Sequence, residues 1–262
     1  MQTRPLKIAL DAAPWLGFFA AVLAAWAALF AMQPAPDVAD LTRLYGSDFW
    51  ASLCAPVTGA SAFGPVFLMW ALMSAAMMMP TLVPALKTYR NHGHAGASSG
   101  TTFTVMIAAY LVLWLGFSAL AAGAQLTLAR AGLVGAGGAS VSLGLTSVLL
   151  LVAGFYQFTT LKESCLHECR APLMFFMQYW RPGLAGAAEL GLRLGAICIG
   201  CCWALMLLGF VGGVMNLAWM GIATVLMVVE KLPDLGRYVT RPLGAILIAA
   251  GLFAGAQALV QM

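Results

Sequence analysis

The chain has few charged residues. Asp, Glu, Lys and Arg make up only 8% of its 262 residues, whereas hydrophobic residues make up 62%, and the mean hydropathy is +0.92. Soluble globular domains typically carry about 25% charged residues. The scarcity of charge therefore excludes an ordinary soluble domain and indicates a polytopic membrane protein.

The chain also lacks a nucleotide-binding loop. Its glycine clusters do not end in the Lys-Ser/Thr pair that closes a phosphate-binding loop, so we do not expect it to drive transport by ATP hydrolysis. No linker separates two hydrophobic blocks, and we see no internal repeat. The sequence therefore predicts a single integral membrane domain over residues 1–262.

Seven apolar stretches are long enough to cross a bilayer as helices, which takes about 20 residues. They cover residues 14–32, 62–84, 102–128, 141–161, 190–211, 213–230 and 242–260. The first is longer than the core of a signal peptide, so we expect it to be retained. We predict an all-α fold, a polytopic transmembrane helical bundle of about seven helices in contact with the lipid bilayer.

Basic residues orient this bundle, because Lys and Arg favour the cytoplasmic side of a membrane. With the N-terminus inside, the cytoplasmic segments carry Arg4, Lys7, Lys87, Arg90, Lys162, Arg170, Arg181, Lys231, Arg237 and Arg241. The outer segments carry only Arg43 and Arg130. We therefore predict the N-terminus in and the C-terminus out. The net charge of +4 then reflects topology, and we expect no nucleic-acid partner.

Among the side chains that can bind a metal ion, those that carry sulfur are abundant in this chain. Five of the six cysteines fall in two short segments, and a Met-Met-Met-Pro run lies upstream at residues 77–80. The cysteines are Cys165, Cys169, Cys198, Cys201 and Cys202. In the predicted topology both segments and the methionine run approach the cytoplasmic side. Thiolates and thioethers are soft ligands that select Cu(I), Zn or other thiophilic metals.

Helical spacing refines the candidate ligands, because residues four apart share a face. One predicted stripe contains Cys198, Cys202 and Met206, and a second contains Met69, Met73 and Met77. Cys201 faces another side of the same helix and is a weaker candidate. Each methionine taken singly is more simply a packing residue, and the cysteine spacing does not match a zinc finger.

Three further side chains have alternative interpretations. His167, between the paired cysteines, is either a ligand or a solvated side chain at the membrane surface. Glu230 closes an apolar helix, where carboxylates are often functional, although it could simply pair with Lys231. His92 and His94 lie in a polar stretch that fits a flexible loop better than a site of metal capture.

At these residues the chain resembles a bacterial family of predicted metal-binding integral membrane proteins, a domain of unknown function. The resemblance rests on Met-Met-Met-Pro at 77–80, Cys-Leu-x-x-Cys-Arg at 165–170, Cys-x-Gly-Cys-Cys-Trp at 198–203, and Glu230-Lys231. It implies metal binding in a bacterial inner (cytoplasmic) membrane, crossed several times. The resemblance supplies neither the ion nor a reaction.

The leading hypothesis is binding, with transport or delivery, of a soft metal ion, in first place Cu(I), at a cytoplasmic-side Cys/Met cluster. We expect Cys165, Cys169, Cys198 and Cys202 as primary ligands, because cytoplasmic thiols stay reduced. The secondary or relay ligands are Cys201, His167, Met77, Met78, Met79, Met206 and Glu230. A metallochaperone or a cuproprotein would be the partner.

Two alternatives remain open at this point. A structural zinc site, Zn(II) on thiolates, could tie the segment after the fourth helix to the fifth within a membrane scaffold. Alternatively, Cys201-Cys202 or the Cys165/Cys169 pair could serve a membrane thiol-disulfide oxidoreductase. The sequence leaves the metal, the direction of transport and the oligomeric state undecided.

Overall fold

The computed structural model describes residues 3–32, 63–92, 100–135 and 137–261, and this part of the chain is all-α. The first helices are α1 (Thr3–Ala31), α3 (Phe63–His92), α4 (Gly100–Arg130), α5 (Leu143–Tyr156) and α6 (Thr160–Arg170). They are followed by α7 (Pro172–Tyr179), α8 (Gly183–Leu207), α9 (Gly209–Gly212), α10 (Leu217–Glu230) and α11 (Gly236–Val260).

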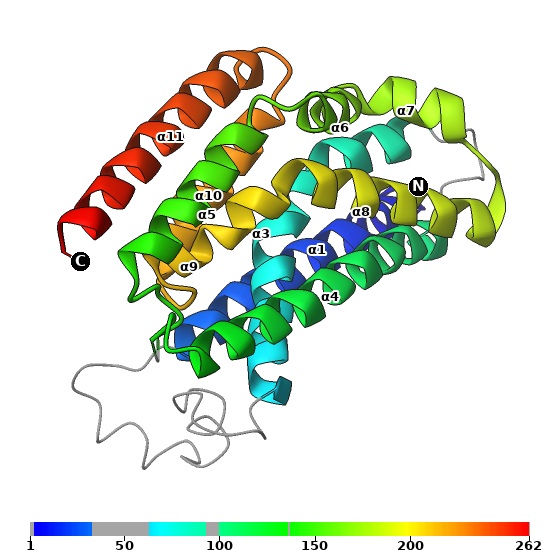
Figure 1. The fold of residues 1–262 in the computed structure, drawn as a ribbon. Helices are drawn as coiled ribbons and strands as arrows, with labels where there is room; N and C mark the ends of the chain where they lie inside the picture. The colour runs from blue at the N-terminus through cyan, green and yellow to red at the C-terminus, as the bar shows by residue number, and fades with distance from the viewer. Residues whose placement is uncertain (1–2, 33–62, 93–99, 136, 262) are drawn as a thin grey trace, which may run out of the picture.

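The helices form two groups that share α8. On one side α1, α3, α4 and α8 pack against one another, and on the other α5 pairs with α11, with α10 beside them (Figure 1). Helices α6 and α7 lie across one end of the bundle, where α3 ends and α8 begins (Figure 1). Helix α6 thereby packs against α8.

Within the described part of the chain, five helices are long and apolar enough to cross a membrane, judged by length and composition. A sixth span is obtained if α5 and α6, bent by 62° at their junction, are counted as one. The predicted span at 213–230 corresponds to α10, a shorter apolar helix of 14 residues. The count of seven spans and the orientation therefore stay predictions.

Several helix ends differ from those expected. Helix α1 begins at Thr3, α8 at Gly183 and α11 at Gly236, each earlier than its apolar core. The reason is that polar and charged residues at a helix end still form intrahelical hydrogen bonds, so hydropathy marks only the apolar part of a helix. Pro242 lies inside α11.

Helix α3 continues through Pro80 and Pro84 instead of ending there. A proline inside a helix leaves the carbonyl four residues earlier without its usual donor. For Pro80 this carbonyl belongs to Ala76, and the indole Nε1–H of Trp26 donates to it at 3.1 Å. A neighbouring helix thus satisfies the freed group, as is common where helices pack in lipid.

Close helix approach depends on small residues. A Cβ added at Gly191 of α8 would lie 2.2 Å from a backbone oxygen of α4. Between α5 and α11, an added Cβ would lie 2.7 Å from the nearest atom at Gly154 and 2.8 Å at Gly251, and Ser147 Oγ donates to the Gly251 carbonyl at 2.7 Å. Glycine at these positions lets neighbouring helices approach closely, which fixes α8 against α4 and α5 against α11.

The bend between α5 and α6 aims the first cysteine segment at α8. Thr159 begins α6 as its N-cap, with its Oγ1 accepting from the Lys162 amide at 3.3 Å. Such a cap satisfies an orphan N–H at a helix start. The expected single span over 141–161 is therefore broken, and α6 carries its cysteines back across the end of the bundle.

Candidate metal centre

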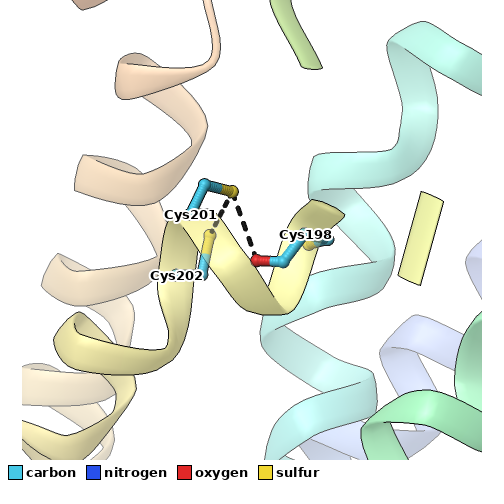
Figure 2. Close-up of side chains that lie close together, drawn as sticks. All are labelled: Cys198, Cys201 and Cys202. Atoms are coloured by element: carbon cyan, nitrogen blue, oxygen red, sulfur yellow. Dashed lines mark hydrogen bonds between the residues drawn. The ribbon is translucent and has the colours of Figure 1, made fainter. Parts of the chain in front are cut away.

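Three cysteine thiols of α8 form the densest group of soft donors among the described residues. The Sγ atoms of Cys198, Cys201 and Cys202 all lie within 4.8 Å of one another and are buried (Figure 2). Cys201 Sγ lies 3.2 Å from Cys202 Sγ and 3.2 Å from the Cys198 carbonyl oxygen. Cys201, the weaker candidate in the sequence, therefore belongs to the group.

A fourth thiol approaches from α6. Cys169 Sγ lies 4.0 Å from Cys201 Sγ, so the two cysteine segments meet as predicted. Cys169 and Cys198 also line a cavity of about 20 Å³, together with Thr81 and Tyr110. A cavity of that size admits one water-sized occupant next to two of the thiols.

Cys165 takes a different place from the one expected. It lies one helical turn before Cys169, partly buried, and its Sγ packs against Gly200 of α8, where an added Cβ would come within 2.6 Å. Residues four apart share a helix face, so both α6 cysteines do face α8. Cys165 nevertheless lies beside the densest group and outside it.

Lys231 contacts the centre directly, and sequence reasoning missed it. Its ammonium donates to Cys198 Sγ at 3.0 Å and to Thr81 Oγ1 at 2.8 Å. The Tyr110 hydroxyl lies 3.0 Å from the same sulfur and 3.2 Å from the Met78 carbonyl oxygen. A cation next to a sulfur favours the thiolate, which is the form that ligates metals.

The Glu230 carboxylate is paired with a lysine of α6. Its carboxylate accepts from Lys162 Nζ at 2.9 and 3.2 Å, and both side chains are 1% exposed. Its backbone oxygen accepts from Arg170 Nε at 2.9 Å. These contacts tie the end of α10 to α6, and Lys231 is the next residue. The alternative interpretation, an ion pair between Glu230 and Lys231, does not hold, because Glu230 pairs with Lys162 and Lys231 contacts Cys198.

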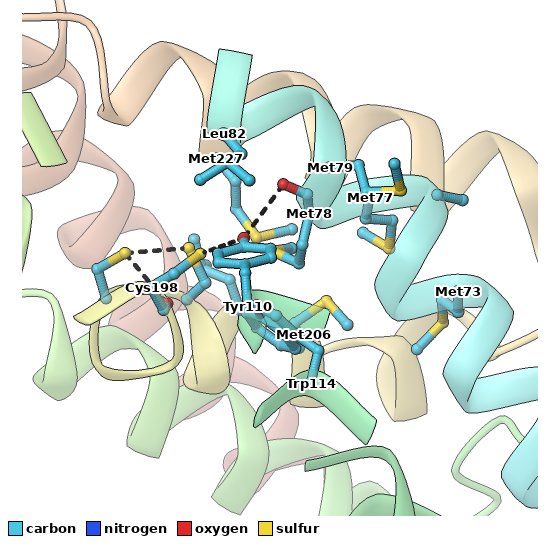
Figure 3. Close-up of a cluster of buried hydrophobic side chains, with 14 of the residues drawn as sticks. Met73, Met77, Met78, Met79, Leu82, Tyr110, Trp114, Cys198, Met206 and Met227 are labelled. Atoms are coloured by element: carbon cyan, nitrogen blue, oxygen red, sulfur yellow. Dashed lines mark hydrogen bonds between the residues drawn. The ribbon is translucent and has the colours of Figure 1, made fainter. Parts of the chain in front are cut away.

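Methionines surround the inner side of the thiol group. Met77, Met78 and Met79 are all buried, and so is Met206 on α8 (Figure 3). Met227 of α10, which spacing did not single out, joins the same cluster (Figure 3). The two predicted sulfur stripes are thus brought into one buried cluster that extends away from the cysteines.

The histidines contribute nothing to the described cluster. His167 is exposed on α6 and lies outside the group of thiols that could hold one ion. The side chain of His92 and the whole of His94 lie outside the described residues, as does Cys54. Of the three histidine candidates, only His167 can therefore be placed, and it faces away from the centre.

The donor set is chemically soft throughout. Four thiols and a surrounding shell of thioethers lie in a largely buried, apolar setting, and no carboxylate joins the described thiol group. Such ligands suit Cu(I) and other thiophilic ions and disfavour Mg or Ca. The arrangement therefore offers a soft ion a largely buried set of sulfur donors.

Comparison with known proteins gives one family. A family model, PpoB2, with the description copper chaperone, matches residues 67–254. The matched range contains every sulfur ligand candidate named above. No curated protein and no solved structure matches the chain.

Proposed function

The chain belongs to the PpoB2 family of copper chaperones, and we propose that it binds Cu(I) inside a helical membrane domain and passes it on. The observation that carries this proposal is the buried group of three α8 thiols with Cys169 of α6 beside it. We propose Cys169, Cys198, Cys201 and Cys202 as the primary ligands. Cys165, at the edge of the group, would be an accessory ligand.

The membrane setting is part of the proposal. Five apolar helices of sufficient length support it, and the distribution of basic residues supports a cytoplasmic position for α6 and α7. The whole chain would then be one multi-pass domain of a bacterial inner membrane. Cu(I) would be received on the cytoplasmic side, where thiols stay reduced.

The methionines support movement of the ion beyond simple storage. Met77, Met78 and Met206 lie behind the thiols in one buried cluster (Figure 3), and thioethers bind Cu(I) more weakly than thiolates do. A graded series of soft ligands allows an ion to leave one site for the next. We propose that the methionines relay copper toward a cuproprotein partner or across the membrane.

Metal content tests the binding step. Purified protein loaded with Cu(I) under reducing conditions should retain about one equivalent of copper, measured by elemental mass spectrometry. A Cys198→Ser/Cys202→Ser variant should lose it, whereas Met174→Leu, an exposed methionine on α7, serves as the matched control. Full retention of copper by the double cysteine variant would refute the site.

Thiol redox chemistry is the second candidate, and one observation favours it. Cys201 Sγ lies 4.0 Å from Cys169 Sγ, so a disulfide between α6 and α8 would require the two sulfur atoms to approach by only about 2 Å. Mass spectrometry after alkylation would show a substrate-dependent disulfide if this activity were real. Tight retention of Zn(II) that Cu(I) does not displace would instead favour a structural zinc site.

A further inference from the structure

We propose that Lys231 makes this centre selective for a monovalent soft cation over a divalent one. The proposal rests on the proposed function, because it concerns the same thiols. The Lys231 side chain is buried, and its ammonium lies 3.0 Å from Cys198 Sγ. Thr81 Oγ1 accepts a second hydrogen bond from it at 2.8 Å. A buried positive charge therefore lies in contact with the sulfur atom of a proposed ligand.

Charge decides which ion such a site prefers. The ammonium repels a bound cation in proportion to the charge of that cation, so a divalent ion is opposed twice as strongly as a monovalent one. This difference does not depend on how many of the thiols ligate the ion, because it arises from the direct repulsion between the ammonium and the bound cation. The repulsion is strong here because the ammonium is buried, where water screens it little.

The other nearby charges do not remove this effect. Lys162 and Glu230 are paired with each other, so together they contribute little net charge. Glu168 lines the same cavity as Lys231, but it is partly exposed, so water screens its carboxylate more than it screens the buried ammonium. Among the described side chains, Lys231 is thus the cationic group in direct contact with the thiols.

The fold holds this charge in place. Lys231 follows the last residue of α10, and Glu230 is fixed through its carboxylate by Lys162 and through its backbone oxygen by Arg170. Gly236 packs so closely on that backbone that an added Cβ would lie 2.1 Å from the Glu230 oxygen. The backbone that carries Lys231 is therefore fixed through its neighbour Glu230, and the ammonium itself is held by Thr81 and Cys198.

The test compares two thiophilic ions that differ in charge, Ag(I) and Cd(II). Dissociation constants of both ions are measured by competition for the purified protein and for the neutral Lys231→Met variant. Removal of the ammonium should shift the Ag(I)/Cd(II) affinity ratio toward Cd(II) by at least about tenfold. Lys87→Met, the same change at an exposed position near the end of α3, should leave the ratio within about twofold.

Each outcome distinguishes the two proposals. A Lys231→Met protein that binds both ions with the native ratio overturns the selectivity role alone. A native protein that binds neither ion overturns the proposed function, and the selectivity role with it. If Lys231→Met does not elute as a folded protein, Lys231→Gln should show the same shift and Lys231→Arg, which keeps the charge, should show none.

Discussion

The buried ion pair between Lys162 and Glu230 provides a quantitative test of how the end of α10 is held. Both side chains are 1% exposed, and Nζ lies 2.9 Å from Oε2. Removing one partner of such a pair leaves an uncompensated buried charge, which costs about 3–5 kcal/mol. Glu230→Gln should therefore lower the free energy of unfolding by that amount, a large part of the total for a typical domain.

The double variant separates the charge pair from simple loss of packing. Lys162→Met with Glu230→Gln removes both charges and keeps the volume of each side chain, and the Arg170 bond to the Glu230 backbone oxygen is untouched. We expect it to lose less stability than either single variant, because no unpaired charge remains. The coupling between the two sites should then exceed about 3 kcal/mol, at the upper end of the range for residues in contact.

The assay is equilibrium unfolding in detergent, followed by tryptophan fluorescence, for the native protein, both single variants and the double variant. Losses that simply add in the double variant would refute the reasoning, because additivity means that the two groups do not interact. Single variants within about 0.5 kcal/mol of the native protein would refute it as well, since changes of that size are typical of surface positions.

Three further predictions concern packing and the thiols. Gly191→Ala places a Cβ 2.2 Å from an α4 backbone oxygen and should lower the free energy of unfolding by about 1–3 kcal/mol in the same assay. The control Gly116→Ala, where an added Cβ meets nothing within 4 Å, should leave stability unchanged or raise it slightly. Tyr110→Phe removes a hydroxyl 3.0 Å from a ligand sulfur and should cost about 1 kcal/mol; an unchanged midpoint would contradict that contact. Cys169→Ser should weaken Cu(I) binding in a competition assay more than Cys165→Ser does, and the reverse order would place the ion one turn earlier on α6.

The sequence alone predicts that the two cysteine segments lie close together. Apolar run length gave the approximate positions of the long helices, and i,i+4 spacing put Cys198 and Cys202 on one face of α8. The basic residues then placed Cys169 and the methionine run near the same end. The structure confirms that these residues come together, although it does not test the membrane orientation from which the expectation came.

Cys201 was underestimated because spacing alone does not fix a side-chain rotamer. Its Sγ turns back to the Cys198 carbonyl oxygen at 3.2 Å, which carries it next to Cys202. Lys231 was missed for a related reason. Adjacent residues point in directions about 100° apart around a helix, so Glu230 and Lys231 meet different partners instead of each other.

The central claim is that sulfur atoms of these cysteines hold Cu(I), and X-ray absorption at the copper edge tests it most directly. Protein loaded with one equivalent of Cu(I) under reducing conditions should show a first coordination shell of sulfur alone. The Cys198→Ser/Cys202→Ser variant should lose that shell or fail to retain copper. A first shell of nitrogen or oxygen atoms in the native protein would contradict the account.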